Sequence, residues 1–177
     1  MSRYLRGGLV ATAAAALLTT ALLTGAFAAP PDDLAAARAA TARFNSLKQA
    51  EKAGYALPPE GPLSQCIESL DPVNEPGAMG FHLINGALLD GVVDPTKPEA
   101  LVYAPDKNGK LRLVALEYVV FKSDWQGEHD PMLFGEMFMS TDAPNRYEIP
   151  AFYALHAWVW EDNPAGTFAG FNPNVSC

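Results

Sequence analysis

Residues 151–160 constrain the fold of this chain more than any other segment. They read AFYALHAWVW, a run without a single charged side chain that Pro150 precedes and the polar sequence EDNP follows. An apolar run of this length, rich in aromatic residues, is typical of a buried strand. The run includes His156, so the fold has to accommodate an imidazole inside or beside its core.

The first 29 residues have the pattern of a secretory signal peptide. Two arginines lie near the start, an apolar run follows, and Ala26-Phe27-Ala28 matches the small-x-small site of signal peptidase. We expect cleavage after Ala28 or Ala29, with residues 30–177 exported as a single domain. The alternative is an uncleaved membrane anchor, because the apolar run approaches the ~20 residues that span a bilayer.

The charge balance of the exported part excludes two classes of partner. Without the two arginines of the leader, ten Lys and Arg side chains remain against twenty acidic ones, a net charge of −10. A phosphate backbone and an anionic membrane surface both require a basic face. We therefore expect no nucleic acid and no membrane as partner after cleavage. Cations, neutral small molecules and basic proteins stay compatible, and the oligomeric state is not constrained.

The chain has two cysteines, Cys66 and Cys177, both in the exported part. Export places them in an oxidising compartment, which favours an intramolecular disulfide between them. An intermolecular bridge and free thiols are the alternatives. Two cysteines are too few for a thiolate zinc site.

Periodicity predicts an α+β fold. Apolar residues at three- and four-residue steps predict one amphipathic helix over 33–53, with Gly54 as its stop. Strands are expected at 78–85, 100–104, 111–121 and 151–160, and residues 132–139 suit a short helix or a strand. Asn108-Gly109 marks a hairpin between the second and third strands. The prediction is a helix packed on an antiparallel sheet of four or five strands, with closure into a barrel as a variant.

The familiar catalytic motifs are absent from the sequence, and a dispersed group of residues takes their place as the candidate site. His82, Glu117 and His156 each lie inside a predicted strand. Strict alternation over 111–121 places Glu117 on the face of the apolar odd-numbered residues, where a carboxylate needs a partner or a proton. Two imidazoles and one carboxylate are the ligands of many zinc and iron sites. We therefore predict these three as metal and ligand-binding residues, with Glu117 as the candidate catalytic base.

The same alternation gives His156 an aromatic face that includes Trp158, which we count among the ligand-binding residues because rings around a polar group form a typical small-molecule pocket. Structural roles are the alternative for each member. A buried histidine often only donates to a carbonyl group, and Glu117 could pair with Arg112, Arg146 or a histidine. His129, in a polar loop, is expected to be a solvated residue.

Several short motifs resemble an uncharacterised family of secreted bacterial proteins, with an alanine-rich leader of actinobacterial style. They are GAMGFH at 77–82, LHAW at 155–158, NPxGxF at 163–168 and the tail NPNVSC at 172–177. The resemblance implies export and a terminal cysteine, and no activity, substrate or ligand.

The sequence thus supports three hypotheses on function. The first is a secreted small-ligand-binding protein with a pocket that contains His82, Glu117 and His156, around a divalent metal ion as the candidate cofactor. The second is a non-enzymatic extracellular interaction module whose surface consists of the aromatic loops at Trp125, Phe168 and Phe171 and whose histidines are structural. The third is a structural envelope protein without a small ligand. Whether the chain is an enzyme is left open.

Overall fold

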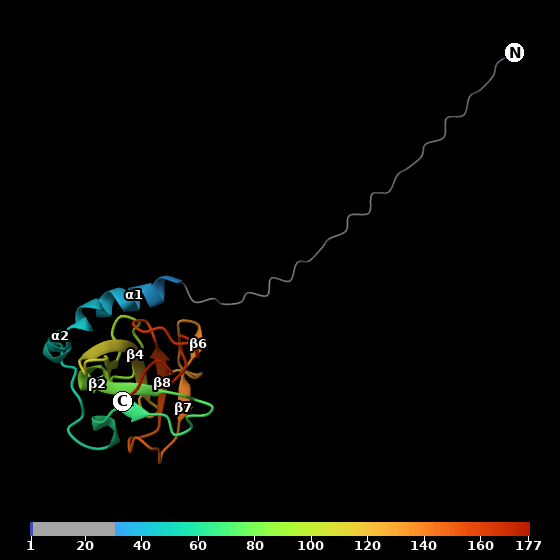
Figure 1. Cartoon of the computed structure of the whole chain (residues 1–177). Helices are drawn as coiled ribbons and strands as arrows, with labels where there is room; N and C mark the ends of the chain where they lie inside the picture. The colour runs from blue at the N-terminus through green and yellow to red at the C-terminus, as the bar shows by residue number, and fades with distance from the viewer. Residues whose placement is uncertain (2–30) are drawn as a thin grey trace.

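An antiparallel sheet of six strands forms the centre of the molecule (Figure 1). The computed structural model describes Met1 and residues 31–177. From edge to edge the strands are β1 (Ile67–Glu68), β2 (Ala78–Ile84), β3 (Ala100–Pro105), β4 (Leu111–Phe121), β8 (Phe152–Ala157) and β7 (Met139–Thr141). The sheet curls into an open half-barrel and does not close.

The α+β class is therefore confirmed, but the prediction of four or five strands is wrong. The two additional strands are the edges, β1 and β7, which have two and three residues. Strands this short show no readable alternation in the sequence. The ambiguous segment 132–139 contains β5 (Met132–Leu133) and β6 (Glu136–Met137), which form a separate two-stranded hairpin.

The predicted helix over 33–53 is interrupted. It consists of α1 (Pro31–Thr41), the 3₁₀ turn η1 (Ala42–Asn45) and α2 (Leu47–Lys52), with Ser46 in an extended conformation between the last two. Phe44 explains the break, because its ring is buried and its carbonyl group accepts a hydrogen bond from the Tyr103 hydroxyl of the sheet. The predicted stop is confirmed: Gly54 follows α2 with φ of +95°.

Two short 3₁₀ turns complete the regular structure, η2 (Pro62–Ser64) and η3 (Gly86–Leu88). The predicted signal peptide falls outside the described residues, apart from Met1, so its cleavage site stays a prediction. Within residues 31–177, no helix combines the length and apolar character that crossing a bilayer requires.

The hairpin of β3 and β4 contains a β-bulge that changes which residues share a face. Val102 pairs with Ala115 and Tyr103 pairs with Leu113, which leaves Val114 as the additional residue. As a result Leu113 packs in the cluster on the helix side, and Val114 packs on the opposite side together with Ala115. The strict alternation predicted over 111–121 is therefore wrong before residue 115, and Glu117 does not share its face with Leu111 and Leu113.

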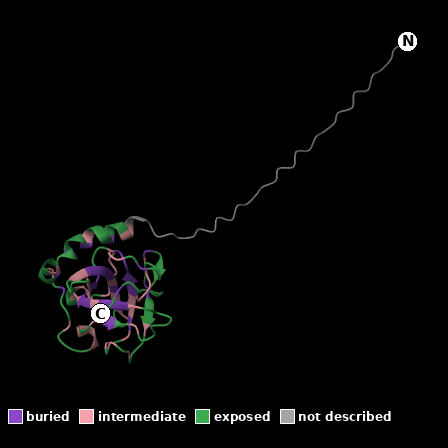
Figure 2. Ribbon diagram, viewed as in Figure 1, coloured by how far each residue is buried: buried purple, intermediate pink, exposed green. Residues whose placement is uncertain are grey.

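The central strands of the sheet are largely buried (Figure 2), and core clusters lie on both of its faces. On one face, buried residues of the helical segment pack against the larger apolar residues of the strands. They include Ala37, Phe44, Ala50, Leu101, Tyr103, Leu116, Tyr118 and Leu155. Loops and the C-terminal segment cover the other face, which carries the histidines and Glu117.

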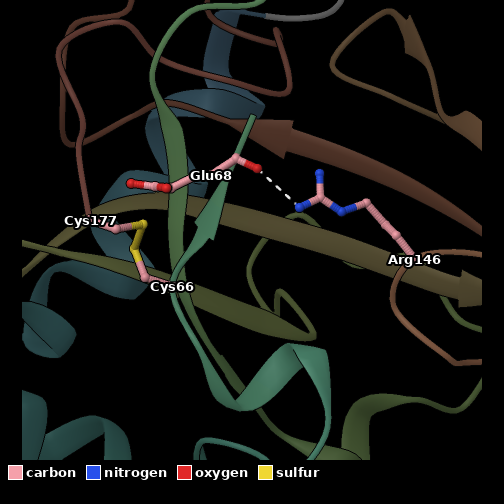
Figure 3. The surroundings of a disulfide bond; sticks show 4 residues. All are labelled: Cys66, Glu68, Arg146 and Cys177. Carbon is pink, nitrogen blue, oxygen red and sulfur yellow. Dashed lines mark hydrogen bonds between the residues drawn. A yellow bond between two sulfur atoms is a disulfide. The ribbon is translucent and has the colours of Figure 1, made fainter. Parts of the chain in front are cut away.

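The disulfide between Cys66 and Cys177 is confirmed (Figure 3). It joins the last residue of the chain to the residue before β1, and its two Cα atoms lie 5.7 Å apart. Beside it, the Arg146 guanidinium donates to the backbone carbonyl of Glu68 at 3.0 Å. Edge strand β1 is therefore held from two directions, by the C-terminus and by the loop before β8.

Reduction of this disulfide should destabilise the domain strongly. The bond closes a loop with a sequence separation of 111 residues, so the loss of the loop-closure constraint corresponds to roughly 4–5 kcal/mol in the chain-entropy model. Urea denaturation with and without dithiothreitol measures the effect. The Cys66→Ser/Cys177→Ser variant should match the reduced protein and no longer respond to the reductant; equal stabilities of the oxidised and reduced protein would contradict this expectation.

Candidate functional site

Three side chains from separate strands meet on the face opposite the helices. His82 Nε2 lies 3.2 Å from Glu117 Oε2 and 3.4 Å from His156 Nε2. His156 Nδ1 lies 3.4 Å from Glu117 Oε1. One potential ligand atom from each residue lies within 4.8 Å of the others, the only such group of His, Cys, Asp and Glu found in residues 31–177.

Strand register explains how residues so distant in sequence come together. Glu117 of β4 and His156 of β8 are direct cross-strand partners, so their side chains lie on the same face. His82 lies on β2, two strands from Glu117, and β3 runs between them. On β3, the residue opposite Glu117 is Ala100. Its small side chain leaves the two longer ones free to meet above β3.

A glycine lets β2 approach β3 closely beside this site. Gly80 has φ of +118°, and a Cβ atom at this position would lie 2.5 Å from the Tyr103 carbonyl oxygen. A side chain here would push β2 away from β3 two residues before His82. The position of His82 therefore depends on Gly80.

Two of the three separations in the group are close to those of a metal coordination shell. Tetrahedral zinc binds histidine nitrogen and carboxylate oxygen at about 2.0–2.2 Å, which separates neighbouring ligand atoms by roughly 3.3–3.5 Å. The distances from His82 Nε2 to Glu117 Oε2 and to His156 Nε2 are 3.2 and 3.4 Å. One ligand atom from each of the three residues lies within 4.8 Å of the others, so the group has the composition and the approximate size of a metal site.

Burial perturbs all three groups toward their neutral forms. Desolvation lowers the pKa of His82 to about 4. Desolvation, and secondarily the neighbouring His82, lowers the pKa of His156 well below its ordinary value. Desolvation, and secondarily the charge of Glu99, raises the pKa of Glu117 to about 8. Clustered shifts of this kind are a feature of functional sites.

The hydrogen bonding of His82 is incomplete. Its Nδ1 is the one buried side-chain polar atom in the described residues that makes no hydrogen bond of good geometry, and the Gly80 backbone acts only as a weak partner that partly opposes the fall in the pKa of His82. If Nδ1 carries the proton, the Nε2 lone pair faces Glu117, which can donate a proton to it below its own pKa of about 8. Once Glu117 is ionised, a cation at Nε2 would remove the repulsion between the lone pair and the carboxylate.

Trp158 supports the site from behind. Its ring stacks on His156, with centroids 5.8 Å apart and an interplanar angle of 24°, and its indole N–H donates to the Ala169 carbonyl at 2.6 Å. Trp158 does not line the cavity described below. Its predicted contact with a ligand stays a prediction, and in the structure the ring contacts His156.

Trp160 would share the face of His156 if the predicted strand 151–160 were unbroken, but it lies on the helix side of the sheet. Its indole N–H donates to Thr41 Oγ1 at 3.2 Å, and the Arg38 guanidinium lies over its ring. The reason is that β8 ends at Ala157, so the alternation does not continue through the predicted strand 151–160.

A cavity of about 360 Å³ opens onto Glu117 and both histidines. This volume falls in the range of small-molecule pockets. Its walls are mainly apolar and aromatic, and they come from the strands, from the loop at 58–63, from the loop at 147–149 and from the C-terminal segment. Prominent wall residues are Ile67, Ile84, Val119, Phe121, Tyr147, Phe152, Ala154 and Phe168. The side chain of Glu117 retains 13% exposure, whereas His82 retains 2% and His156 retains 5%.

Glu99 is a cavity residue that the sequence analysis missed. It ends the charged, proline-rich segment 94–99, which has the composition of a solvated loop, yet it is 1% exposed and lines the cavity. Its Oε2 accepts the Val119 N–H at 2.9 Å. The β3–β4 pairing ends at Ala100 and Glu117, so the carboxyl group takes the place of the carbonyl oxygen that a longer β3 would offer to Val119. Desolvation raises its pKa to about 8, with smaller contributions from Asp90 and Asp94. The only sign of its burial in the sequence is that Glu99 directly precedes the predicted strand at 100–104.

The other candidate residues lie away from the cluster. Arg112 pairs with Glu161, and Arg146 binds the Glu68 carbonyl, so neither is the partner of Glu117. His129 is exposed, and its carbonyl accepts the Trp125 indole N–H at 2.7 Å.

The three aromatic residues of the interaction-module hypothesis do not form an exposed patch. Trp125, Phe168 and Phe171 are each partly buried, and the Phe168 ring stacks on Phe134 of the helix-side core.

Comparison with protein-family models, curated proteins and solved structures finds no match for this chain. The site's geometry is therefore the basis for any assignment of function.

Replacement of Glu99 should change how stability depends on pH. Because the folded pKa of about 8 lies above the ordinary value of 4.5, the native state holds a proton that the unfolded state has lost. Its contribution is fully present below pH 4.5 and is lost as pH rises toward 8, by up to about 1.4 kcal/mol per pH unit. Glu99→Gln, which keeps an acceptor for Val119, should equal the wild type in urea denaturation at pH 4.5 and exceed it at pH 8. Parallel profiles would contradict this account.

Proposed function

We propose that this chain is a secreted small-ligand-binding protein whose pocket holds a divalent transition-metal ion, with zinc the best fit. His82, His156 and Glu117 are the protein ligands. The observation that carries the proposal is the convergence of these three donors, from three strands, within 4.8 Å of one another. Two imidazoles and one carboxylate on rigid strands form a three-ligand set of the kind that catalytic and ligand-binding zinc sites use.

The arrangement of atoms supports specific roles for the donors. His82 Nε2, His156 Nε2 and Glu117 Oε2 are the ligand atoms. His156 Nδ1 lies 3.4 Å from Glu117 Oε1, without a hydrogen bond between them. Trp158, stacked on His156, holds the plane of the ring.

The cavity supports a ligand at the metal's remaining coordination positions. Three protein ligands leave tetrahedral zinc one open position, and Glu117 is the member of the group that is most exposed to the cavity. No lysine or arginine of residues 31–177 lines this cavity, whereas four glutamates do, namely Glu60, Glu99, Glu117 and Glu148. The walls therefore disfavour an anion and favour a largely apolar, neutral or cationic molecule with one oxygen or nitrogen donor for the metal.

Within this proposal, Glu117 is a ligand and therefore not the catalytic base predicted from the sequence. The second carboxyl group of the cavity, Glu99, is the titratable group left for proton transfer. With a pKa of about 8 it holds its proton near neutral pH and accepts one only above that value. Binding of a small ligand is the function proposed. Acid–base chemistry at the metal would add a reaction to it, with Glu99 as the proton-transfer group.

The competing hypothesis is a metal-free cluster in which a hydrogen-bonded triad of structural histidines stabilises the curled sheet. It predicts that loss of either histidine reduces stability equally with and without metal. It also predicts no ligand-dependent change in the pocket. The experiments below separate the two hypotheses.

Purified without a polyhistidine tag, the protein should bind one Zn²⁺ or Co²⁺ per chain. His82→Ala, His156→Ala and Glu117→Gln should each abolish stoichiometric binding, because each removes one of three protein ligands. Zn²⁺ at about 100 times its dissociation constant should stabilise the wild type by roughly 2.7 kcal/mol. Elemental analysis and thermal denaturation with and without Zn²⁺ provide the measurements.

His129→Ala is the matched control for these variants, because His129 is exposed and remote from the cluster. It should bind metal and respond to it as the wild type does. Absence of bound metal in the wild type, together with a melting temperature that Zn²⁺ does not change, would contradict the proposed metal site.

An open coordination position should be detectable with a small chelating probe. Acetohydroxamic acid is neutral and small enough for the cavity, so its addition should change the visible spectrum of the Co²⁺-loaded protein. Ala154→Phe, which fills the cavity wall beside His156, should keep the metal but weaken the response to the probe. A Co²⁺ spectrum that the probe leaves unchanged would indicate a closed structural site.

A further inference from the structure

The hairpin of β5 and β6 carries an unusual concentration of exposed methionine. The whole chain has five methionines, and three of them, Met132, Met137 and Met139, lie within eight residues. Their exposed fractions are 57%, 60% and 60%. Methionine is normally a core residue, and Met79, the other methionine outside the leader region, is 8% exposed. The hairpin thus presents its thioethers to solvent.

Strand pairing places the three side chains on one surface. Met132 and Met137 are direct partners, so their side chains share a face with Cβ atoms about 5 Å apart. Phe138, 3% exposed, points into the core between Met137 and Met139. In an extended chain, residues two apart share a face at about 7 Å, so Met139 projects with Met137.

The ladder extends past the hairpin far enough to fix this arrangement. The Phe138 N–H donates to the Pro131 carbonyl at 3.0 Å, which continues the register of Met132 with Met137. Met139 is therefore a diagonal neighbour of Met132, at about 7–8 Å. Each methionine has three rotatable side-chain bonds, so three Sγ atoms can reach one common point.

We propose that Met132, Met137 and Met139 form a surface site for a soft monovalent cation, namely Cu(I). Thioether sulfur is a soft ligand that selects Cu(I) over harder divalent ions. Both cysteines are used in the disulfide, so thioethers are the soft donors left in the described chain. Met139 also lies beside the cavity that contains the His–Glu cluster. The thioether donors differ chemically from the donors of that cluster, so the site does not depend on the function proposed above.

The charge around the hairpin suits a cation. Every charged side chain from 128 to 139 is acidic, namely Glu128, Asp130 and Glu136. Asp130 is oriented by the Tyr153 hydroxyl, which donates to its Oδ1 at 2.8 Å. These carboxylates supply a negative potential, while the three sulfurs supply the selectivity.

Silver(I) provides a redox-inert probe for this site. In a ¹H–¹³C spectrum of the methionine ε-methyl groups, Ag⁺ should shift the signals of Met132, Met137 and Met139 with a one-to-one endpoint and leave Met79 unchanged. In competition with bicinchoninate, the wild type should hold one Cu(I) per chain. The Met132→Leu/Met137→Leu/Met139→Leu variant should bind Cu(I) more than about 100-fold more weakly.

Met79→Leu is the matched control and should retain wild-type Cu(I) affinity, as should His156→Ala, which separates this site from the His–Glu cluster. Two results would overturn the proposal. The first is Cu(I) affinity that the triple leucine variant retains. The second is Ag⁺ addition that moves none of the three exposed ε-methyl signals, which would leave the hairpin as an apolar surface only.

Discussion

The direct pairing of Glu117 with His156 across β4 and β8 is the constraint on which the site depends. With β4 fixed against β3, a slip of one residue in this register would turn His156 to the helix face, where Leu116, Tyr118 and Leu155 now pack, and would leave Glu117 without it. The bulge at Val114, in the β3–β4 pair, determines which face of β4 carries Glu117. Large apolar residues on the helix face thereby hold polar residues in place on the opposite face.

The arrangement is costly for a metal-free protein. Three ionisable groups are removed from water, and one imidazole nitrogen has no hydrogen-bond partner in the described structure. Desolvation of such groups is expensive unless each is paired. The neighbours Trp158, stacked on His156, and Ala100, opposite Glu117 on β3, are apolar and offer these groups no hydrogen bond. A divalent cation among the three groups would offset this cost, which is why we favour a metal site over a purely structural cluster.

The sequence revealed the main elements and the site residues but not their geometry. Alternation and Asn108-Gly109 located the hairpin of β3 and β4, and the long apolar run located β8. The edge strands β1 and β7 could not be predicted, because two or three residues are too few to show alternation. The bulge could not be predicted because Val114 and Ala115 are both apolar and suit either face of the sheet. The helix break at Ser46 depends on a tertiary contact, the hydrogen bond from Tyr103 to Phe44, that local periodicity does not encode.

Within the candidate site, residue type was more informative than position. A carboxylate and two imidazoles inside apolar strands stand out in any sequence, so His82, Glu117 and His156 could be selected without knowledge of the fold. Glu99 could not, since a glutamate in a proline-rich, charged segment has the pattern of a solvated loop. Its burial follows from tyrosines distant in sequence that hold this segment, as Tyr55 and Tyr118 donate to the carbonyl groups of Pro98 and Pro95.

Anomalous diffraction at the zinc edge from crystals of the Zn²⁺-loaded protein tests the central claim most directly. Our account predicts one strong peak at about 2 Å from His82 Nε2, His156 Nε2 and a Glu117 oxygen, with a further ligand on the cavity side. An empty cluster beside zinc bound elsewhere on the surface, or no ordered zinc at all, would contradict it.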